Sequence, residues 1–346
     1  MSGHGRYMRR CFQLALNGRG STAPNPMVGA VLVYEGKIIG EGWHRKAGLP
    51  HAEPEAIERV KDASLLGKAT LYVNLEPCSH QGRTPACSRL IIDKRIPEVV
   101  VANVDSNPLV AGTGLEMLRR AGVRVTTGIL EKDGRELNRF FFHYHERKRP
   151  YVVLKWAQTA DGYMAPPGGT AYWITNRYAR QRVHQWRSQM QAILIGKETL
   201  KRDNPLLDSR FWNGRPPLPV ILGEPQEGDF RLLKPGRPVF VFGSKRENPG
   251  AFRYADRDLS VILEILYRHE IQSVLVEGGA QVLQAFIETG LWDEARVFTS
   301  PRKFGSGLKS PVLTSFSWLK TEMIAGDKLD WFIHPSNTFI HHGRYL

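Results

Sequence analysis

Apolar positions in the first third of the chain follow two spacings, which predict alternating helices and strands. Apolar side chains three and four residues apart over 7–16 predict a helix with one buried face. The unbroken apolar run 28–34 predicts a buried strand, and Glu35-Gly36 predicts a turn into a second strand at 37–42. Downstream, the same spacings predict strands at 70–75, 99–102 and 123–125 and helices at 51–60, from Cys87 onward and at 114–121. This alternation predicts a three-layer α/β sandwich.

The second half of the chain repeats the alternation after an interruption. A charged run at 146–149 ends in Pro150, directly before a new apolar run, and predicts a domain boundary. We therefore expect one domain over 1–146, a linker over 147–150 and a second α/β domain over 151–346. Strands are predicted at 151–155, 192–196, 219–222, 238–242 and 273–277, and helices at 176–190, 259–269 and 280–289.

Composition agrees with two globular domains and excludes a membrane span. The chain has 346 residues, of which 42% are hydrophobic and 24% charged, as in ordinary soluble proteins. A run of about 18 apolar residues, long enough to cross a bilayer, does not occur. The polar, basic start of the chain lacks the apolar core of a secretion signal, so we expect a cytoplasmic protein.

The net charge of +14 leaves two kinds of partner open. A nucleic acid is one, because clustered cations neutralise phosphates. A substrate and cofactor that carry several phosphates are the other. The basic residues are spread along the whole chain and form no tail, so charge by itself does not decide between them.

One histidine, one glutamate and two cysteines form the strongest chemical signal. Zinc binds imidazole and thiolate, and a catalytic site keeps three protein ligands and one open position. His51, Cys78 and Cys87 supply three such ligands, and Glu53 stands where nucleobase deaminases place their proton-transfer residue. The third cysteine, Cys11, lies in an apolar helical stretch and is predicted to be buried without a function.

The spacing of the two cysteines bears on the class of substrate that the site accepts. Nucleobase deaminases place their cysteines as Cys-x-x-Cys, whereas eight residues, 79–86, separate Cys78 from Cys87 here. The inserted loop carries His80 and Arg83, which would lie at the edge of the metal site as substrate contacts. A long loop without a function is the plainer alternative.

At these residues the chain resembles a known family. Asn25-Pro26-x-Val28-Gly29, His51-Ala52-Glu53 and Glu76-Pro77-Cys78-Ser79-His80-x-Gly82-Arg83-Thr84-Pro85-x-Cys87 are similar to the deaminase half of the bifunctional riboflavin-biosynthesis deaminase–reductases. The resemblance implies a cytidine-deaminase-like three-layer αβα domain with one zinc ion. It also implies that Glu53 is catalytic and that the deaminase substrate contacts Asn25, His44, His80 and Arg83.

The second half contains one candidate phosphate site. The predicted strand 273–277 runs into Gly278-Gly279 and then a helix, and amides at a helix N-terminus attract phosphate. Such a turn also joins many strands to helices without binding anything. Arg187 and Arg210 are candidate phosphate clamps.

Further motifs resemble the reductase half of the same family, which has a dihydrofolate-reductase-like α/β fold and uses NADPH. They are Lys155-x-Ala157-x-Thr159-x-Asp161-Gly162, Trp173-Ile174-Thr175, Thr199-x-x-x-Asp203-Asn204-Pro205-x-Leu207 and Val276-Glu277-Gly278-Gly279. The resemblance implies cofactor contacts at Ala157, Trp173, Thr199, Asp203, Gly279, Ala280 and Gln281. It implies reductase substrate contacts at Ala171, where a serine is usual, and at Arg187, Leu207, Arg210 and Glu277.

The activity implied is deamination of a free, phosphorylated pyrimidine, followed by NADPH-dependent reduction of its ribosyl group to ribityl. This leaves no role for nucleic acid or membrane, and a homodimer or higher homo-oligomer is expected from base rates. The alternative is a tRNA or single-stranded nucleic-acid base deaminase with a basic C-terminal domain. A zinc-stabilised binding protein is disfavoured, because structural zinc normally has four protein ligands.

Overall fold

The computed structural model describes residues 3–79, 85–108, 110–168, 172–225, 228–234, 236–243 and 251–345. These residues form two compact units, one running up to Arg147 and also including the segment from Phe339, the other spanning Lys148–Thr338. The expected division at 146–151 lies close to this one, but the expected second domain extended to residue 346. The contacts instead place the chain's last residues in the first unit.

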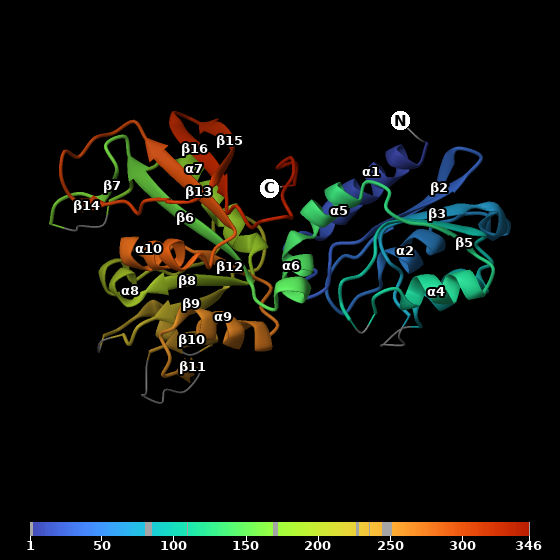
Figure 1. The fold of residues 1–346 in the computed structure, drawn as a ribbon, viewed down its shortest axis with the longest axis horizontal. Coiled ribbons are helices and arrows are strands. Elements are labelled where there is room, and N and C mark those ends of the chain that lie inside the picture. Colours follow the sequence, from blue (N-terminus) through green and yellow to red (C-terminus); the bar gives the residue numbers. More distant parts are fainter. Residues whose placement is uncertain are drawn as a thin grey trace. The chain divides into compact units, whose positions relative to one another are not determined.

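The first unit is built on a five-stranded sheet in the order β2-β1-β3-β4-β5 (Figure 1). Strand β1 is antiparallel to β2 and β3, whereas β3, β4 and β5 are parallel. The strands are β1 (Gly29–Tyr34), β2 (Lys37–Trp43), β3 (Thr70–Leu75), β4 (Glu98–Asn103) and β5 (Arg124–Thr126).

Helices cover both faces of this sheet, as a three-layer sandwich requires (Figure 1). One face packs against α1 (Gly3–Ala15) and α5 (Glu131–Leu137), with Cys11 fully buried as predicted. The other face packs against α2 (Ala52–Glu58), α3 (Cys87–Asp93) and α4 (Thr113–Arg120). Short 3₁₀ turns lie at Leu16–Gly18 and Ala63–Lys68.

One helix of the first unit runs into the segment expected to be a linker. Helix α6 spans Arg139–Arg147 and buries Phe141 and Phe142. The mixed charges at its end led us to expect a solvated linker from residue 147, yet the apolar residues before them have helical spacing and find partners in the core. The boundary is therefore a helix end and not an extended connection.

The chain's last residues pack on α5 and α6. Phe339 is buried with Leu75, Phe141 and Phe142. The Glu136 carboxylate, on α5, accepts hydrogen bonds from the backbone N–H groups of residues 341, 342 and 345, at 2.9–3.2 Å. This segment therefore contributes both apolar area and satisfied polar groups to the first unit.

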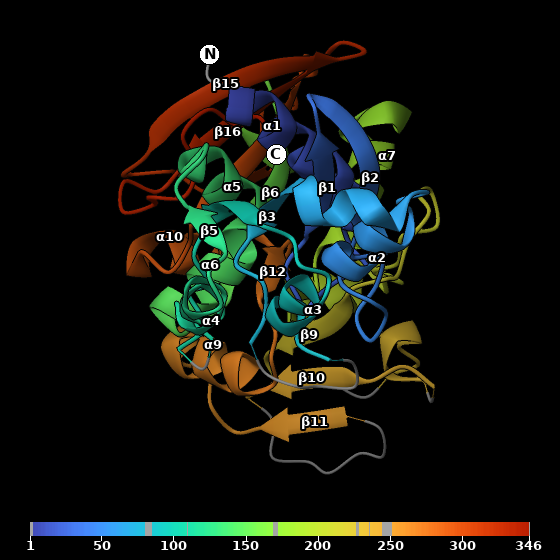
Figure 2. The ribbon, with the colours of Figure 1, turned by 90° about the vertical axis from the view of Figure 1, so that its right-hand side faces the viewer.

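The second unit contains a nine-stranded sheet in the order β11-β10-β9-β8-β12-β6-β13-β16-β15, which Figure 2 shows from β11 at the bottom to β15 at the top. All neighbours are parallel except β16 with β13 and β15 with β16. The strands are β6 (Tyr151–Thr159), β8 (Ala192–Gly196), β9 (Leu218–Leu222), β10 (Val239–Phe242), β11 (Ala251–Tyr254), β12 (Ser273–Val276), β13 (Glu294–Ser300), β15 (Ser317–Ile324) and β16 (Asp327–Ile333). A separate pair joins β7 (Tyr163–Ala165) to β14 (Leu308–Lys309).

Helices also lie on both faces of the second sheet. Helices α9 (Leu259–Arg268) and α10 (Ala280–Thr289) bury apolar residues against one face. On the other face, Trp186 of α7 (Arg177–Gln189) packs near Phe298 and Trp331. A short helix α8 (Lys197–Asp203) follows β8, and a 3₁₀ turn lies at Arg231–Leu233. Within the described residues, no helix is long and apolar enough to cross a membrane.

Candidate functional site

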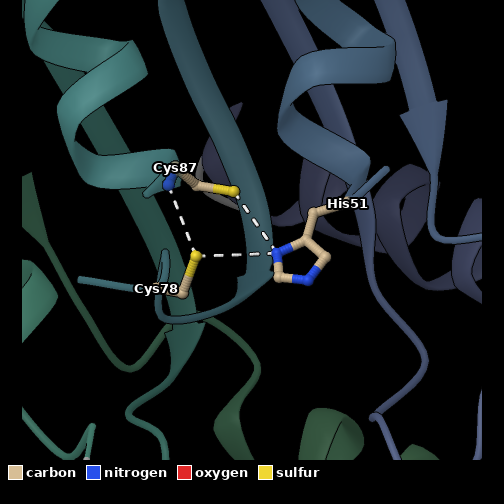
Figure 3. Close-up of side chains that lie close together, drawn as sticks. All are labelled: His51, Cys78 and Cys87. Carbon is tan, nitrogen blue, oxygen red and sulfur yellow. Dashed lines mark hydrogen bonds between the residues drawn. The ribbon is translucent and has the colours of Figure 1, made fainter. Parts of the chain in front are cut away.

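The three predicted zinc ligands come together at one end of the first sheet (Figure 3). His51 is the residue before α2, Cys87 is the first residue of α3, and Cys78 lies three residues after β3. The sequence folds this way because the buried strand β3 ends at Leu75 and delivers Cys78 to the point where both helices begin. Two helix starts and one strand end thus converge on a single point.

The distances between the ligand atoms fit a zinc ion. Nδ1 of His51 lies 3.6 Å from Sγ of Cys78 and 3.4 Å from Sγ of Cys87. Tetrahedral zinc with usual bond lengths separates nitrogen and sulfur ligands by about 3.6 Å. The backbone N–H of Cys87 also donates to Sγ of Cys78 over 3.3 Å, which favours the thiolate that a metal needs. The donor set and its spacing both suit zinc.

The same contacts shift the pKa values of the three ligands. The hydrogen bond with Cys78 raises the pKa of His51 to about 9, and the bond with Cys87 lowers the pKa of Cys78 to about 4. The same hydrogen bond between the two side chains raises the pKa of the Cys87 thiol. Zinc binds neutral imidazole and thiolate, so its binding releases the protons that these pKa shifts favour on His51 and Cys87.

Glu53 has the environment of a proton carrier. Its side chain is 2% exposed, and Oε2 has no hydrogen-bond partner among the described residues. Burial raises its pKa to about 7, because the charged form of a carboxyl group is disfavoured away from water. A carboxyl group with a pKa near neutrality can both take and return a proton.

The predicted deaminase substrate residues divide into two groups. Asn25 and His44 lie together, with Nδ2 of Asn25 3.2 Å from Nε2 of His44, and the His44 ring stands edge to face with that of His51. Burial lowers the pKa of His44. His80 and Arg83 lie outside the described residues.

Glu76 is a residue whose part in the site sequence reasoning did not identify. Its carboxylate accepts four backbone N–H bonds of 2.9–3.3 Å, from residues 105, 112, 114 and 115. The approach is so close that a Cβ on Gly114 would lie 2.0 Å from the carbonyl oxygen of Pro77. Glu76 therefore fixes the segment Pro77-Cys78 against the start of α4; its position next to Cys78 was the only signal in the sequence.

In the second unit, the predicted glycine turn joins β12 to α10. A Cβ on Gly278 would lie 2.7 Å from the backbone nitrogen of Gly196, so this position requires glycine. The N–H of Gly279 donates to Oγ1 of Thr199 over 2.9 Å, which brings two predicted cofactor residues together. Helix α10 begins at Ala280 and has no side-chain cap, as a phosphate-binding helix start would.

The predicted reductase substrate residues meet beside this turn. Arg187 donates to both oxygens of Glu277, at 2.9 and 2.8 Å, and to the backbone carbonyl of Asp208. Arg210 pairs with the Asp208 carboxylate at 2.7 Å, and Leu207, the residue before Asp208, has a φ of +47°. The bond from Arg187 to the Asp208 carbonyl holds the segment 207–210 to α7.

Lys155 is a second residue that sequence reasoning left without a role. Its Nζ lies 3.7 Å from Glu277, and the side chain is 15% exposed. Burial lowers its pKa. Although burial opposes it, the charges of Arg187 and Lys155 lower the pKa of Glu277 to about 2, so the carboxylate stays ionised.

The other predicted reductase residues are more scattered. Trp173 is 67% exposed and lies under the guanidinium of Arg180, and Asp203 is the exposed last residue of α8. Ala157 lies on β6 opposite Phe298, and Gln281 is in the first turn of α10. Within the described residues, no hydrogen bond or ion pair joins Trp173 or Asp203 to the glycine turn. Ala171 lies outside the described residues.

Two family models match the chain, one for each unit. Residues 1–103 match the cytidine and deoxycytidylate deaminase zinc-binding region, and residues 150–323 match the RibD C-terminal domain. The zinc-ligand set and the reductase domain agree with the cofactors expected, Zn²⁺ and NADPH.

Relatives match over most of the chain. The riboflavin biosynthesis protein RibD of Aquifex aeolicus (strain VF5) is 41% identical over 87% of this chain and 88% of its own, and that of Escherichia coli (strain K12) is 36% identical over 87% and 88%. A crystal structure from Thermotoga maritima, of a diaminohydroxyphosphoribosylaminopyrimidine deaminase/5-amino-6-(5-phosphoribosylamino)uracil reductase, superposes with a TM-score of 0.88 at 38% identity, covering 96% of this chain and 99% of the other. The fold of both units and the convergent zinc-ligand set agree with these matches. Together they show that the chain belongs to the RibD family of riboflavin biosynthesis proteins.

Proposed function

We propose that this chain catalyses two successive steps of riboflavin biosynthesis on one phosphorylated pyrimidine. The substrates are those named for the Thermotoga maritima relative: a diaminohydroxyphosphoribosylaminopyrimidine is deaminated, and the resulting 5-amino-6-(5-phosphoribosylamino)uracil is reduced. The observation that carries the proposal is the convergence of His51, Cys78 and Cys87 next to a buried Glu53 oxygen that no described residue hydrogen-bonds.

For the deamination, His51, Cys78 and Cys87 would hold zinc, which supplies Lewis-acid activation of a water molecule. Glu53 takes a proton from that water and returns it to the amine that leaves as ammonia. Its pKa of about 7 suits both directions of transfer at neutral pH. Asn25 and His44, beside His51, contact the pyrimidine.

For the reduction, NADPH supplies the hydride. The start of α10 and the Gly278-Gly279 turn bind cofactor phosphate, and Thr199 orients the turn through its bond to the N–H of Gly279. Arg187 and Arg210 direct positive charge towards the phosphate of the substrate, while Glu277 holds Arg187 in place.

Incubation of the protein with the diaminopyrimidine ribosyl phosphate, with and without NADPH, tests both steps. We expect ammonia release without NADPH, and NADPH oxidation only after ammonia has been released. Glu53→Gln should abolish ammonia release while the zinc content stays at one ion per chain. Ammonia release that survives in this variant would contradict the assignment of Glu53.

We also propose a cytoplasmic homo-oligomer that does not act on nucleic acid. Part of the +14 charge then serves the phosphates of substrate and cofactor. Light scattering measures the oligomer directly. Salt-sensitive binding of tRNA at micromolar concentration or below would instead favour a nucleic-acid partner.

A further inference from the structure

The buried ring of His184 has a nitrogen without a partner beside a charged segment of the second unit. His184 lies on α7 and is 5% exposed. Its Nδ1 is buried and has no hydrogen-bond partner among the described residues. Oδ1 of Asp208 lies 3.9 Å from this nitrogen, about one ångström beyond a hydrogen bond. Buried polar atoms are nearly always satisfied, so this nitrogen requires an explanation.

The Asp208 carboxylate is paired with Arg210 instead. Nη1 of Arg210 donates to Oδ1 of Asp208 over 2.7 Å, and the two side chains are 45% and 26% exposed. The guanidinium also lies 5.1 Å from the centre of the Phe211 ring, and that ring stands edge to face with the ring of His184. Asp208 therefore has one donor in Arg210 and a second within a small side-chain movement.

The backbone of this segment is fixed without help from the Asp208 side chain. Arg187 donates to the carbonyl of Asp208 over 3.3 Å, and Arg237 donates to three carbonyl oxygens of the loop 206–217 at 2.6–3.0 Å. Arg187 is itself bound to both oxygens of Glu277. Rotation of the Asp208 side chain therefore changes its partner while the chain around it stays in place.

We propose that Asp208 changes partner when the phosphate of the reductase substrate binds: Arg210 turns to the phosphate, and Nδ1 of His184 replaces it as the donor to the Asp208 carboxylate. The inference rests on the proposed role of Arg210 as a phosphate contact. A phosphate dianion competes well for a half-exposed guanidinium, because a pair between exposed side chains is weak. Without a second donor, the released carboxylate would stay partly buried and unpaired. His184 is thus a positioning residue, which stabilises the bound state without touching the substrate.

The charges around His184 agree with this exchange. Four charged groups face the ring: Arg187 on its own helix, Asp208 and Arg210 on the loop after α8, and Glu277 after β12. Burial and the two arginines lower the pKa of His184 to about 4, whereas the two carboxylates oppose them. Neutralisation of Arg210 by phosphate and the approach of Asp208 would both raise this pKa.

The first test measures binding of ribose 5-phosphate to the full-length, zinc-loaded protein by calorimetry, with ribose as the control that lacks phosphate. The part of the affinity that Arg210→Ala removes reports on this site. His184→Leu removes the donor, whereas His184→Asn keeps one at the place of Nδ1. We expect His184→Leu to weaken binding about tenfold, as for one lost hydrogen bond to a charged group, and His184→Asn to recover most of it. Equal losses in both variants would overturn the proposal, as would an affinity that does not depend on Arg210.

A double substitution separates action through Asp208 from direct contact of His184 with phosphate. Asp208→Asn alone should bind ribose 5-phosphate about threefold more tightly, because Arg210 no longer pairs with a carboxylate. Adding His184→Leu to Asp208→Asn should then weaken binding little further. A loss from His184→Leu of the same size in both backgrounds would overturn the proposal. Weaker binding by Asp208→Asn would also overturn it, since the carboxylate would then serve to aim Arg210.

Nuclear magnetic resonance of the histidine rings gives a readout that a loss of packing would not change. His184→Asn identifies the signal of His184. We expect its pKa to rise by about one pH unit or more when ribose 5-phosphate binds to the unaltered protein, and to rise less in Asp208→Asn. The same rise in both proteins would contradict the exchange. If the unaltered protein bound ribose 5-phosphate but did not oxidise NADPH with the deaminated substrate, the proposed reduction would fail, and the binding measurements would still decide the exchange.

Discussion

The two candidate sites of this chain differ in what their charged and metal-binding groups already contact. In the first unit, the ligand atoms of His51, Cys78 and Cys87 face one point and contact only one another and nearby backbone, and Oε2 of Glu53 has no hydrogen-bond partner among the described residues, so the set can still take up an ion and a water. In the second unit, Arg187 and Glu277 already satisfy each other. The comparison teaches that a metal site can be recognised from ligand atoms that face one point. An anion site is harder to recognise, because its cationic side chains can already be paired with carboxylates of the protein.

Removing a zinc ligand should give the largest loss of activity, and the loss should affect only the reaction of the first unit. Cys87→Ala leaves two protein ligands, and we expect zinc loss and a fall in ammonia release on the order of a thousandfold or more, since metal activation of water supplies several kcal/mol. NADPH oxidation on already deaminated substrate should be unchanged. Cys11→Ala, in the same unit but remote from the ligand set, is the matched control; a similar loss of zinc there would contradict the site.

Breaking the ion pair of the second unit should cost stability as well as activity. Arg187→Ala leaves the carboxylate of Glu277 buried beside Lys155 alone, and such a charge costs about 3–5 kcal/mol. Urea unfolding measures the loss. The double variant Arg187→Met with Glu277→Leu should be less destabilised than Arg187→Ala, because it leaves no buried carboxylate and because Lys155, whose pKa burial already lowers, can give up its proton. If both were equally unstable, lost packing and not charge would be the cause.

The same pair gives the second unit a dependence on acid. The pKa of Glu277 is lowered from its ordinary value of 4.5 to about 2, so its contribution is fully present above about pH 5 and is lost as the pH falls towards 2. A shift of this size corresponds to about 3 kcal/mol. We expect the unfolding free energy of Glu277→Gln to fall less than that of the unaltered protein between pH 5 and pH 2.5. Parallel pH curves would disprove the assignment.

A smaller loss of stability and of zinc affinity is expected on substitution of Glu76. This substitution tests whether the backbone bonds of Glu76 keep Cys78 in place as a zinc ligand. Glu76→Gln replaces one accepting oxygen by a donor that faces backbone N–H groups, at a cost of about 1–3 kcal/mol. Zinc affinity, measured by competition with a chelator, should weaken because Cys78 lies two residues away. Asp93→Asn, which alters an exposed pair with Arg89, serves as control and should change neither stability nor zinc affinity by more than a few tenths of a kcal/mol.

The sequence predicted the ligand set because its chemistry is carried by residue type. His51, Cys78 and Cys87 bind metal wherever the backbone places them, and the buried strands that deliver them are continuous apolar runs. Glu76 was missed because its partners are backbone N–H groups of the segment 105–115, which exist as a cradle only in the folded chain.

In the second unit, the antiparallel strands were missed for a different reason. In β13, Glu294 and Arg296 form a buried ion pair, with the guanidinium between the rings of Trp186 and Trp331. Their charges give the strand a polar appearance in the sequence although it lies in the core. In strand β15 apolar residues are exposed instead of charged residues buried. It is an edge strand with Trp318 and Met323 exposed, so its sequence lacks the alternation of a half-buried strand.

The segment that Glu136 holds has a consequence for synthesis. A ribosome releases the sheet and helices of the first unit early, but Phe339 and the N–H groups that bind Glu136 emerge only after the whole of Lys148–Thr338 has been translated. At ordinary elongation rates this interval is roughly 10–40 s. During that time Leu75, Phe141 and Phe142 lack the cover that Phe339 gives them and leave a hydrophobic surface on a nascent chain, so the domain made first is the one completed last.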